Sequence, residues 1–261
     1  MLKGIDVSNH NGDIKWITVN NEIDFAMIRA GYSLTMDAKF EANIKSCNAL
    51  GIPCGVYWFS YALSKDAVLN EAKRCVEVIS KYKIQFPVAF DWEYDSDEYY
   101  YKMTGYKLGN DVRAEYAEIF LNYIKSKGYI PMLYTNVDYI DNKGFSKIYK
   151  NYDLWLAHWG VIKPKYECQI WQTNSTGYVN GINGNVDMNI AYKNYNENAH
   201  SDDDKATLLK AIKESYYEKY LEIARDIIKG KYGNGQDRKN KLKALNIDYE
   251  YAQAIVNVLV M

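Results

Sequence analysis

Short apolar segments recur eight times along residues 1–190, and the first five alternate with segments whose apolar residues have helical spacing. The clearest helical patterns are residues 66–82 and 111–127. Alternation of strands with one-faced helices is typical of parallel strands, and eight strands suggest a closed barrel. The sequence therefore predicts an α/β fold with an irregular TIM-like barrel whose final part has lost its helices. The predicted strands are residues 3–8, 25–31, 55–60, 88–93, 131–136, 154–159, 169–173 and 185–190.

The pattern changes after these strands. Residues 195–207 carry a net charge of −3 and almost no apolar side chains, which is typical of a linker. Helical patterns return at residues 206–229, 236–245 and 249–259. We therefore expect a barrel at 1–194, an acidic linker at 195–207 and a small three-helix module at 208–261. A core of this size is marginal, so the module is expected to rest on the barrel or on a second copy of itself.

Composition narrows the class of function. The formal net charge of −1 argues against nucleic acid as a partner, while 26 tyrosines and 6 tryptophans supply aromatic faces that suit sugar rings. The histidines His10, His158 and His200 lack metal-ligand spacing, so no metal or other cofactor is expected.

Four cysteines without a CxxC pair indicate reduced thiols. With no signal-peptide pattern and no apolar transmembrane stretch, we expect synthesis in a reducing compartment and no membrane insertion.

Two carboxylates end the most apolar strand, FPVAFDWE at residues 86–93. Asp91 and Glu93 share a face because strand side chains alternate, and their expected separation is roughly 5–7 Å. That separation falls where glycosidic-bond chemistry places its carboxylates. Asp6 and Asp187 lie near the ends of two other predicted strands, where a barrel gathers its reactive residues. The alternative is that these acids are surface charges at strand ends.

Several blocks then carry a family resemblance. Residues 1–194 resemble glycoside hydrolase family 25, the muramidases of phage lysins and bacterial autolysins, a family with a barrel of eight strands and about five helices. The blocks are KGIDVSNHNG (3–12), IRAGYS (28–33), Asp37, Phe40, Asn43, GVYWFSY (55–61), FDWE (90–93), LYTN (133–136), LWLAHW (154–159), IWQT (170–173) and VDMN (186–189).

This resemblance implies roles for the acids. Glu93 becomes the general acid/base, and Asp91, Asp6 and Asp187 the supporting carboxylates. Crowded carboxylates raise the pKa of the acid and stabilise a positive transition state. Either a carboxylate or the N-acetyl group of the substrate, oriented by Asp91, is the nucleophile, and both routes give net retention. We favour the second route.

Aromatic residues near strand ends are candidate glycan contacts, with packing in the barrel core as the alternative. They are Tyr57, Tyr61, Tyr134 and Trp171, joined by the amide Asn136. In LWLAHW, Trp159 stands where the family often has tyrosine.

Residues 221–260 resemble the GNG-containing cell-wall-binding repeats of phage lysins. The resemblance implies wall contacts from the loop and helix start at Gly233, Asn234, Gly235, Asp237 and Arg238. The alternative is a glycine-rich connection with solvated charges.

Together these resemblances imply an N-acetylmuramidase that cleaves the β-1,4 bond between N-acetylmuramic acid and N-acetylglucosamine in peptidoglycan. A phage endolysin, made in the host cytoplasm and acting on the cell wall after release, is the expected setting. A non-catalytic glycan-binding protein or a chitinase-like glycosidase is the alternative, and self-association through the C-terminal module is a further expectation.

Overall fold

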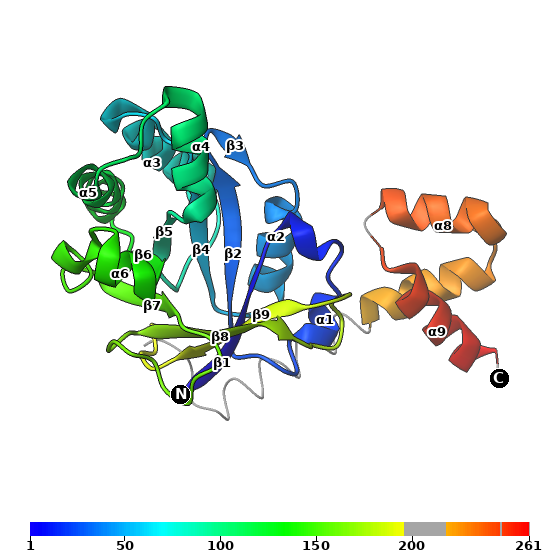
Figure 1. Ribbon diagram of the computed structural model, residues 1–261. Helices are drawn as coiled ribbons and strands as arrows, with labels where there is room; N and C mark the ends of the chain where they lie inside the picture. The colour runs from blue at the N-terminus through cyan, green and yellow to red at the C-terminus, as the bar shows by residue number, and fades with distance from the viewer. Residues whose placement is uncertain (196–217, 246, 261) are drawn as a thin grey trace. The chain divides into compact units, whose positions relative to one another are not determined.

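The computed structural model describes residues 1–195, 218–245 and 247–260, without the side chains of residues 250, 254 and 258 (Figure 1). The chain divides into two compact units, Met1–Asn198 and Ala199–Met261. Apart from Tyr195, the predicted linker lies outside the described residues. No helix among the described residues is long and apolar enough to cross a membrane.

The first unit is a closed barrel, and strands form at all eight predicted places. In the described residues one nine-stranded sheet runs in the order β1-β9-β8-β7-β6-β5-β4-β2-β3, and pairing of β1 with β2 closes it. A short β3 is added to the prediction as an antiparallel partner of β2. The strands are β1 (Leu2–Val7), β2 (Phe25–Tyr32), β3 (Thr35–Met36), β4 (Cys54–Phe59), β5 (Val88–Asp91), β6 (Pro131–Asn136), β7 (Asp153–Ala157), β8 (Ile170–Gly177) and β9 (Val186–Ala191).

The last strand departs from the predicted parallel arrangement. β9 runs antiparallel to both β8 and β1. The eight residues 178–185 join β8 to β9, and a parallel partner would require a crossover of about a dozen residues or more. Asp187 therefore lies near the beginning of its strand, yet it pairs with Asp6, near the end of β1. The reversed direction brings Asp187 to the same mouth as the carboxyl ends of the parallel strands.

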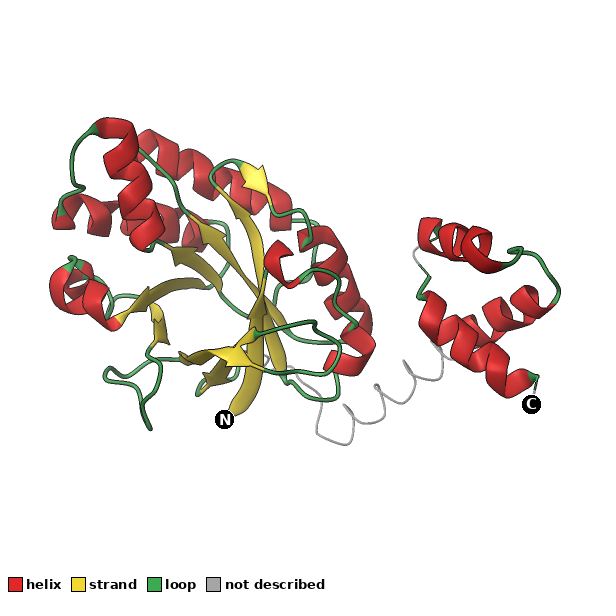
Figure 2. Cartoon of the chain, turned by 45° about the vertical axis from the view of Figure 1, so that its right-hand side comes forward, coloured by secondary structure: helices red, strands yellow, loops and turns green. Residues whose placement is uncertain are grey.

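Helices follow the earlier strands, whereas β7, β8 and β9 are joined by loops, as predicted (Figure 2). Ser64 begins α3 because its hydroxyl accepts a hydrogen bond from the Ala67 N–H. The helices of this unit are α1 (Trp16–Val19), α2 (Phe40–Leu50), α3 (Lys65–Ile79), α4 (Tyr94–Thr104), α5 (Asn110–Ser126) and α6 (Val137–Asn142).

Aromatic packing fills the end of the barrel where the parallel strands begin. The Phe25 and Phe86 rings stack with centroids 4.7 Å apart. Tyr195 packs its ring against Phe86 and donates a hydrogen bond to Asp153, so the chain stays attached to the barrel up to this residue. Because this end is filled with apolar groups, polar chemistry is confined to the opposite mouth.

The C-terminal unit is helical, as predicted. Residues 218–228 are helical and are followed by α8 (Gly235–Ala244) and α9 (Tyr249–Leu259). Their apolar faces form one small core centred on Ala224, Leu242 and Ala252, none of which is exposed. The Asp248 carboxylate begins α9 by accepting a hydrogen bond from the Tyr251 N–H.

Candidate active site

A cavity of about 340 Å³ lies at the mouth of the barrel and collects the four predicted carboxylates. Asp6 and Asp187 come from paired positions of β1 and β9, whereas Asp91 ends β5 and Glu93 follows it. The closed barrel explains the convergence, because Asp187 pairs with Asp6 near the end of β1 and the parallel strand β5 ends at the same mouth. The cavity is lined by Asp6, Val7, Ser8, His10, Asn11, Arg29, Tyr57, Phe59, Asp91, Glu93, Tyr134, Trp155, Gln172, Asn185 and Asp187.

Asp6 and Asp187 form a hydrogen-bonded pair of acids on one side of this cavity. Asp6 Oδ2 accepts from Gln172 Nε2 at 2.9 Å and from Asn189 Nδ2 at 2.8 Å. These two hydrogen bonds lower the pKa of Asp6, but burial, followed by the charge of Asp187, has the larger effect and raises it to about 8. Burial also raises the pKa of Asp187. The pair therefore retains protons that ordinary carboxyls lose below pH 5.

Asp91 and Glu93 form the second pair of acids. Burial raises the pKa of Glu93 to about 7, and burial followed by the charge of Glu93 raises that of Asp91. Asp91 is 3% exposed, and its Oδ1 is buried without a hydrogen-bond donor. Contact with Glu93 becomes a hydrogen bond only when one carboxyl carries a proton. This pair can thus hold a proton near neutral pH and still offer a buried oxygen to a donor.

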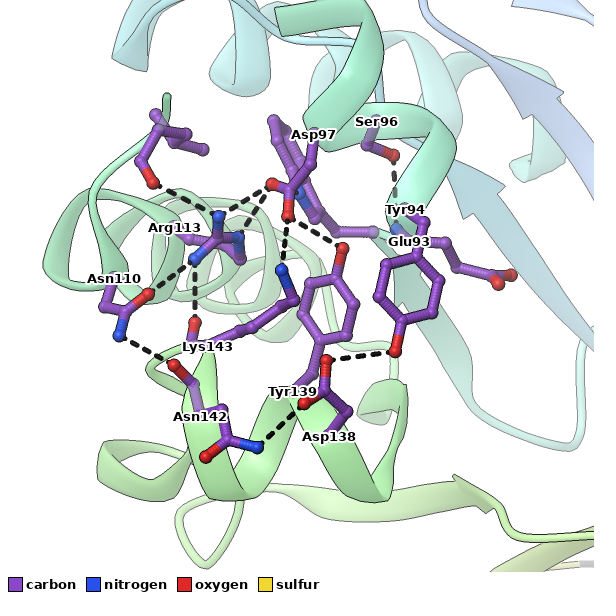
Figure 3. Close-up of polar contacts among 12 residues, drawn as sticks. Glu93, Tyr94, Ser96, Asp97, Asn110, Arg113, Asp138, Tyr139, Asn142 and Lys143 are labelled. Carbon is purple, nitrogen blue, oxygen red and sulfur yellow. Dashed lines mark hydrogen bonds and ion pairs between the residues drawn. The ribbon is translucent and has the colours of Figure 1, made fainter. Parts of the chain in front are cut away.

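A buried ion pair supports the Asp-Trp-Glu segment from behind (Figure 3). Trp92, between the two acids in sequence, donates its indole N–H to Asp97 Oδ1 at 2.9 Å. Arg113 Nη2 lies 2.7 Å from the same oxygen, and the Tyr139 hydroxyl donates to Asp97 Oδ2 at 2.9 Å. The Glu93 side chain points away from this network in Figure 3. Sequence reasoning missed it, although a buried Arg113 within an apolar helical pattern was a possible signal.

Arg29 supplies a positive charge to the cavity lining. Its Nε lies 2.8 Å from Asp37 Oδ2, and the buried Asp37 also accepts from the Lys39 N–H. A second guanidinium nitrogen contacts Asn9. The charge of Arg29 acts to lower the pKa of Asp91, against the larger effect of burial. Arg29 therefore limits how far the acid cluster is neutralised.

The predicted glycan contacts divide into two groups. Tyr57 and Tyr134 line the cavity, and Tyr61 lies beside it, with its ring 5.0 Å from that of Phe59. Trp171 instead donates its indole N–H to the His158 carbonyl, and Asn136 begins α6 by accepting from the Tyr139 N–H. The structure brings neither residue to the cavity lining. Alternation along β8 turns Gln172 inward and Trp171 outward, whereas the Asn136 side chain is used to cap α6.

In the C-terminal unit, the predicted wall contacts surround a tight loop. Gly233 and Gly235 have φ of +72° and +54°, which favours glycine. Asp237 pairs with Lys241. The Arg238 guanidinium donates to the Gly233 carbonyl at 3.0 Å, to Gln253 Oε1 at 3.1 Å and to Asn234 Oδ1 at 3.1 Å. Arg238 therefore ties the loop to α9.

One buried acid outside the cavity makes stability depend on pH. Glu71 is 2% exposed and accepts hydrogen bonds from the Ser60 hydroxyl at 2.5 Å and the Tyr61 N–H at 3.1 Å. Burial raises its pKa from 4.5 to about 7, although both bonds lower it. The folded protein then binds more protons than the unfolded chain between these pH values. The free energy of unfolding must therefore fall as pH rises through this window.

We expect Glu71→Gln to remove part of this pH dependence. The neutral amide still accepts one of the two hydrogen bonds and has no charge to bury. The variant should therefore exceed the wild type in stability at pH 8, by on the order of a few kcal/mol, and lose the advantage at pH 5. Urea unfolding at both pH values measures it. Glu77→Gln, an exposed site on the same helix, is the control, and an unchanged pH slope in Glu71→Gln would contradict the assignment.

Comparison with known proteins agrees with this fold. The model of glycosyl hydrolases family 25 matches residues 5–182, and the CW_7 repeat matches residues 222–260. The chain therefore belongs to glycosyl hydrolases family 25, a family that includes lysozymes.

Among its relatives, the chain is 27% identical to lysozyme M1 of Streptomyces globisporus over 203 residues, which cover 72% of this chain and 67% of that protein. The modular autolysin LytC of Streptococcus pneumoniae shares 30% identity at a TM-score of 0.63, covering 73% of this chain. The match spans 46% of LytC, less than half of its length. The catalytic domain of an endolysin from bacteriophage P40 of Listeria monocytogenes shares the fold, with 22% identity, a TM-score of 0.63, and coverage of 80% and 97%.

Proposed function

We propose that this protein is an N-acetylmuramidase that cleaves the β-1,4 bond between N-acetylmuramic acid and N-acetylglucosamine in peptidoglycan. The observation that carries the proposal is the pair Asp91 and Glu93, which combines an acid of pKa about 7 with a buried carboxyl oxygen lacking a donor. The family, the lysozyme among its relatives and the CW_7 repeat support peptidoglycan as the substrate.

Glu93 performs the proton transfers. At neutral pH a substantial fraction of Glu93 is protonated, so it can donate its proton to the glycosidic oxygen as the bond to the anomeric carbon breaks. Positive charge then develops on the sugar ring. The remaining negative charge of the cluster stabilises this oxocarbenium-like state. After the leaving sugar departs, the Glu93 carboxylate accepts a proton from the water that completes hydrolysis.

Asp91 orients the nucleophile. Its carboxyl group lines the cavity and accepts a hydrogen bond from the N–H of the N-acetyl group, whose carbonyl oxygen attacks the anomeric carbon. Attack by the internal oxygen and then by water inverts the carbon twice, so the product retains its configuration. Release of new reducing ends from purified cell walls tests this activity. Walls that release none with the wild-type protein would reject the proposed function.

The C-terminal unit, in this proposal, holds the enzyme on the wall. Tethering raises the local concentration of the barrel at its polymer. The exposed face of the loop at Gly233 and the side chains near α8 are the proposed contact, with Arg238 keeping the loop in shape through its bonds to Gly233 and Gln253. We further propose an endolysin role, in which the protein is made in the host cytoplasm and reaches the wall after release.

A fragment of residues 1–198 should fold and cleave walls but bind them more weakly than the full chain. The cut keeps Tyr195, which packs against Phe86, and lies at the end of the first compact unit. Sedimentation with purified walls should show at least a tenfold lower affinity for the fragment, within the range over which tethering acts. Equal binding of fragment and full chain would leave the C-terminal unit without the proposed role.

A further inference from the structure

Gln172 makes hydrogen bonds through every position of its side-chain amide. It is buried in β8 and lines the cavity between the acids and two aromatic residues. Its Nε2 donates to Asp6 Oδ2 at 2.9 Å and to Asp187 Oδ2 at 3.3 Å. Its Oε1 accepts from the Tyr134 hydroxyl at 3.0 Å and from the Trp159 indole N–H at 3.1 Å. An amide has two N–H donors and a carbonyl with two lone pairs, so its capacity is filled.

Trp159 decides which way this amide faces. An indole N–H can only donate, so the Gln172 oxygen must lie toward it. A flipped amide would place N–H groups against the indole N–H and the carbonyl against both acids. Tyr134 does not enforce the orientation, because a hydroxyl donates or accepts equally well. Trp159 is not among the residues that line the cavity, and 51% of its surface stays exposed while it makes this bond.

We propose that Gln172 is a positioning residue for the reaction: its amide, locked by the Trp159 indole N–H, donates to both Asp6 and Asp187, favours the charged form of this pair and so keeps negative charge opposite Glu93. The proposal rests on the muramidase function above and adds a residue that touches the supporting acids. Asp6 and Asp187 occupy paired positions on neighbouring strands, where like charges repel. Two hydrogens from one nitrogen stabilise both carboxylates together. Without them the pair holds its proton up to a higher pH and carries less negative charge.

The charge of the pair formed by Asp6 and Asp187 affects the pKa of Glu93. Asp187 is among the groups whose charge raises the pKa of Glu93. When the pair of Asp6 and Asp187 has taken up a proton, its smaller negative charge raises the pKa of Glu93 less. Glu93 then loses its proton at a lower pH, and the alkaline limb of the rate profile moves to lower pH. The other titratable or charged groups lining the cavity are His10 from the turn after β1, Arg29 from β2, Tyr57 from β4, Asp91 from β5 and Tyr134 from β6. These groups are unchanged in all the variants below, so a difference in titration between variants reports the effect of the Gln172 amide.

The test uses full-length Trp159→Phe and Gln172→Met. Trp159→Phe keeps an aromatic ring but loses the indole N–H and one ring, whereas Gln172→Met keeps the length and removes both amide donors and the carbonyl acceptor. Trp16→Phe is the matched control, because it also loses one indole bond, to Asn43 Oδ1, but away from the cavity. Circular dichroism and thermal unfolding check the fold. Trp159 is half exposed, so its variant tests the proposal even if Gln172→Met fails to fold.

The first readout needs no substrate. Aspartate labelled with carbon-13 at Cγ reports the titration of Asp6 and Asp187, assigned through Asp6→Asn and Asp187→Asn. Gln172→Met should raise the titration midpoint of the pair by about one pH unit or more, since a hydrogen bond to a charged group is of this strength. Trp159→Phe should shift it in the same direction by less, and Trp16→Phe should not shift it. An unchanged midpoint in folded Trp159→Phe or Gln172→Met overturns the proposal.

The second readout is the dependence of kcat/KM on pH. Both site variants should move the alkaline limb to lower pH and lower kcat several-fold with little change in KM, and Trp16→Phe should keep the wild-type profile. Loss of activity with an unmoved limb would mean that Gln172 only supports packing. Failure of the wild-type protein to cleave walls would reject the muramidase function, whereas the carbon-13 titration would still decide whether the amide controls the acids.

Discussion

Glu93→Gln should abolish hydrolysis of cell-wall glycan while the protein stays folded. The amide preserves the shape of the side chain but has no proton to give to the leaving oxygen, and loss of a general acid typically lowers the rate by about 10²–10⁴-fold. The pKa of Glu93, raised to about 7, makes it the acid suited to neutral pH. Release of reducing ends from purified walls measures the effect.

The matched control for this variant is Glu98→Gln, which removes an exposed carboxylate from α4, the helix that begins directly after Glu93. It should keep the wild-type rate. Thermal unfolding of both variants ensures that lost activity is not lost structure. Turnover of folded Glu93→Gln within a few-fold of the wild type would remove Glu93 from its assigned role.

Asp91→Asn should lower the rate by about 10²-fold or more, a loss of the size seen when a preorganised charge is removed from a reacting centre. The amide retains an acceptor oxygen but has no charge to balance the positive N-acetyl intermediate. The same variant should be more stable than the wild type, because it removes a buried charge beside Glu93. Rate and unfolding temperature, measured on one preparation, check both effects.

Glycan chains stripped of N-acetyl groups separate the two roles available to Asp91. If the N-acetyl oxygen is the nucleophile, the wild-type enzyme should lose activity on the stripped glycan. If an aspartate attacks directly, the stripped glycan should still be cleaved. Full activity of Asp91→Asn on ordinary walls would contradict both roles.

The sequence predicted the barrel strands well because each is a short apolar run between polar turns. It did not predict the direction of β9, which depends on the short connection at residues 178–185. The error left the site intact: the antiparallel pairing places Asp187 opposite Asp6. The sequence predicted that the acids converge, because it shows carboxylates near the ends of several predicted strands.

The contacts that support the acids were not predictable in the same way. Gln172 reaches Asp6 across 166 residues, and Asp97 reaches Tyr139 across 42. Periodicity tells which face a residue occupies but not which distant residue meets it. Trp171 was predicted as a sugar contact because it is aromatic. Side chains alternate along β8, however, so Gln172 faces the cavity and Trp171 does not.

The C-terminal loop shows a similar limit. Its glycines indicated a tight connection, and the positive φ values of Gly233 and Gly235 agree. Arg238, at the helix start beside them, was predicted to contact the wall because of the resemblance to wall-binding repeats. In the structure its three hydrogen bonds to Gly233, Asn234 and Gln253 give it a role in holding the loop.

The central claim is the identity of the bond that this protein cleaves. Mass spectrometry of fragments released from purified cell walls by the full chain, with Glu93→Gln as the blank, tests it directly. The account predicts disaccharide fragments with N-acetylmuramic acid at the reducing end, and none from the blank. Fragments with N-acetylglucosamine at the reducing end, or free stem peptides with intact glycan, would contradict it.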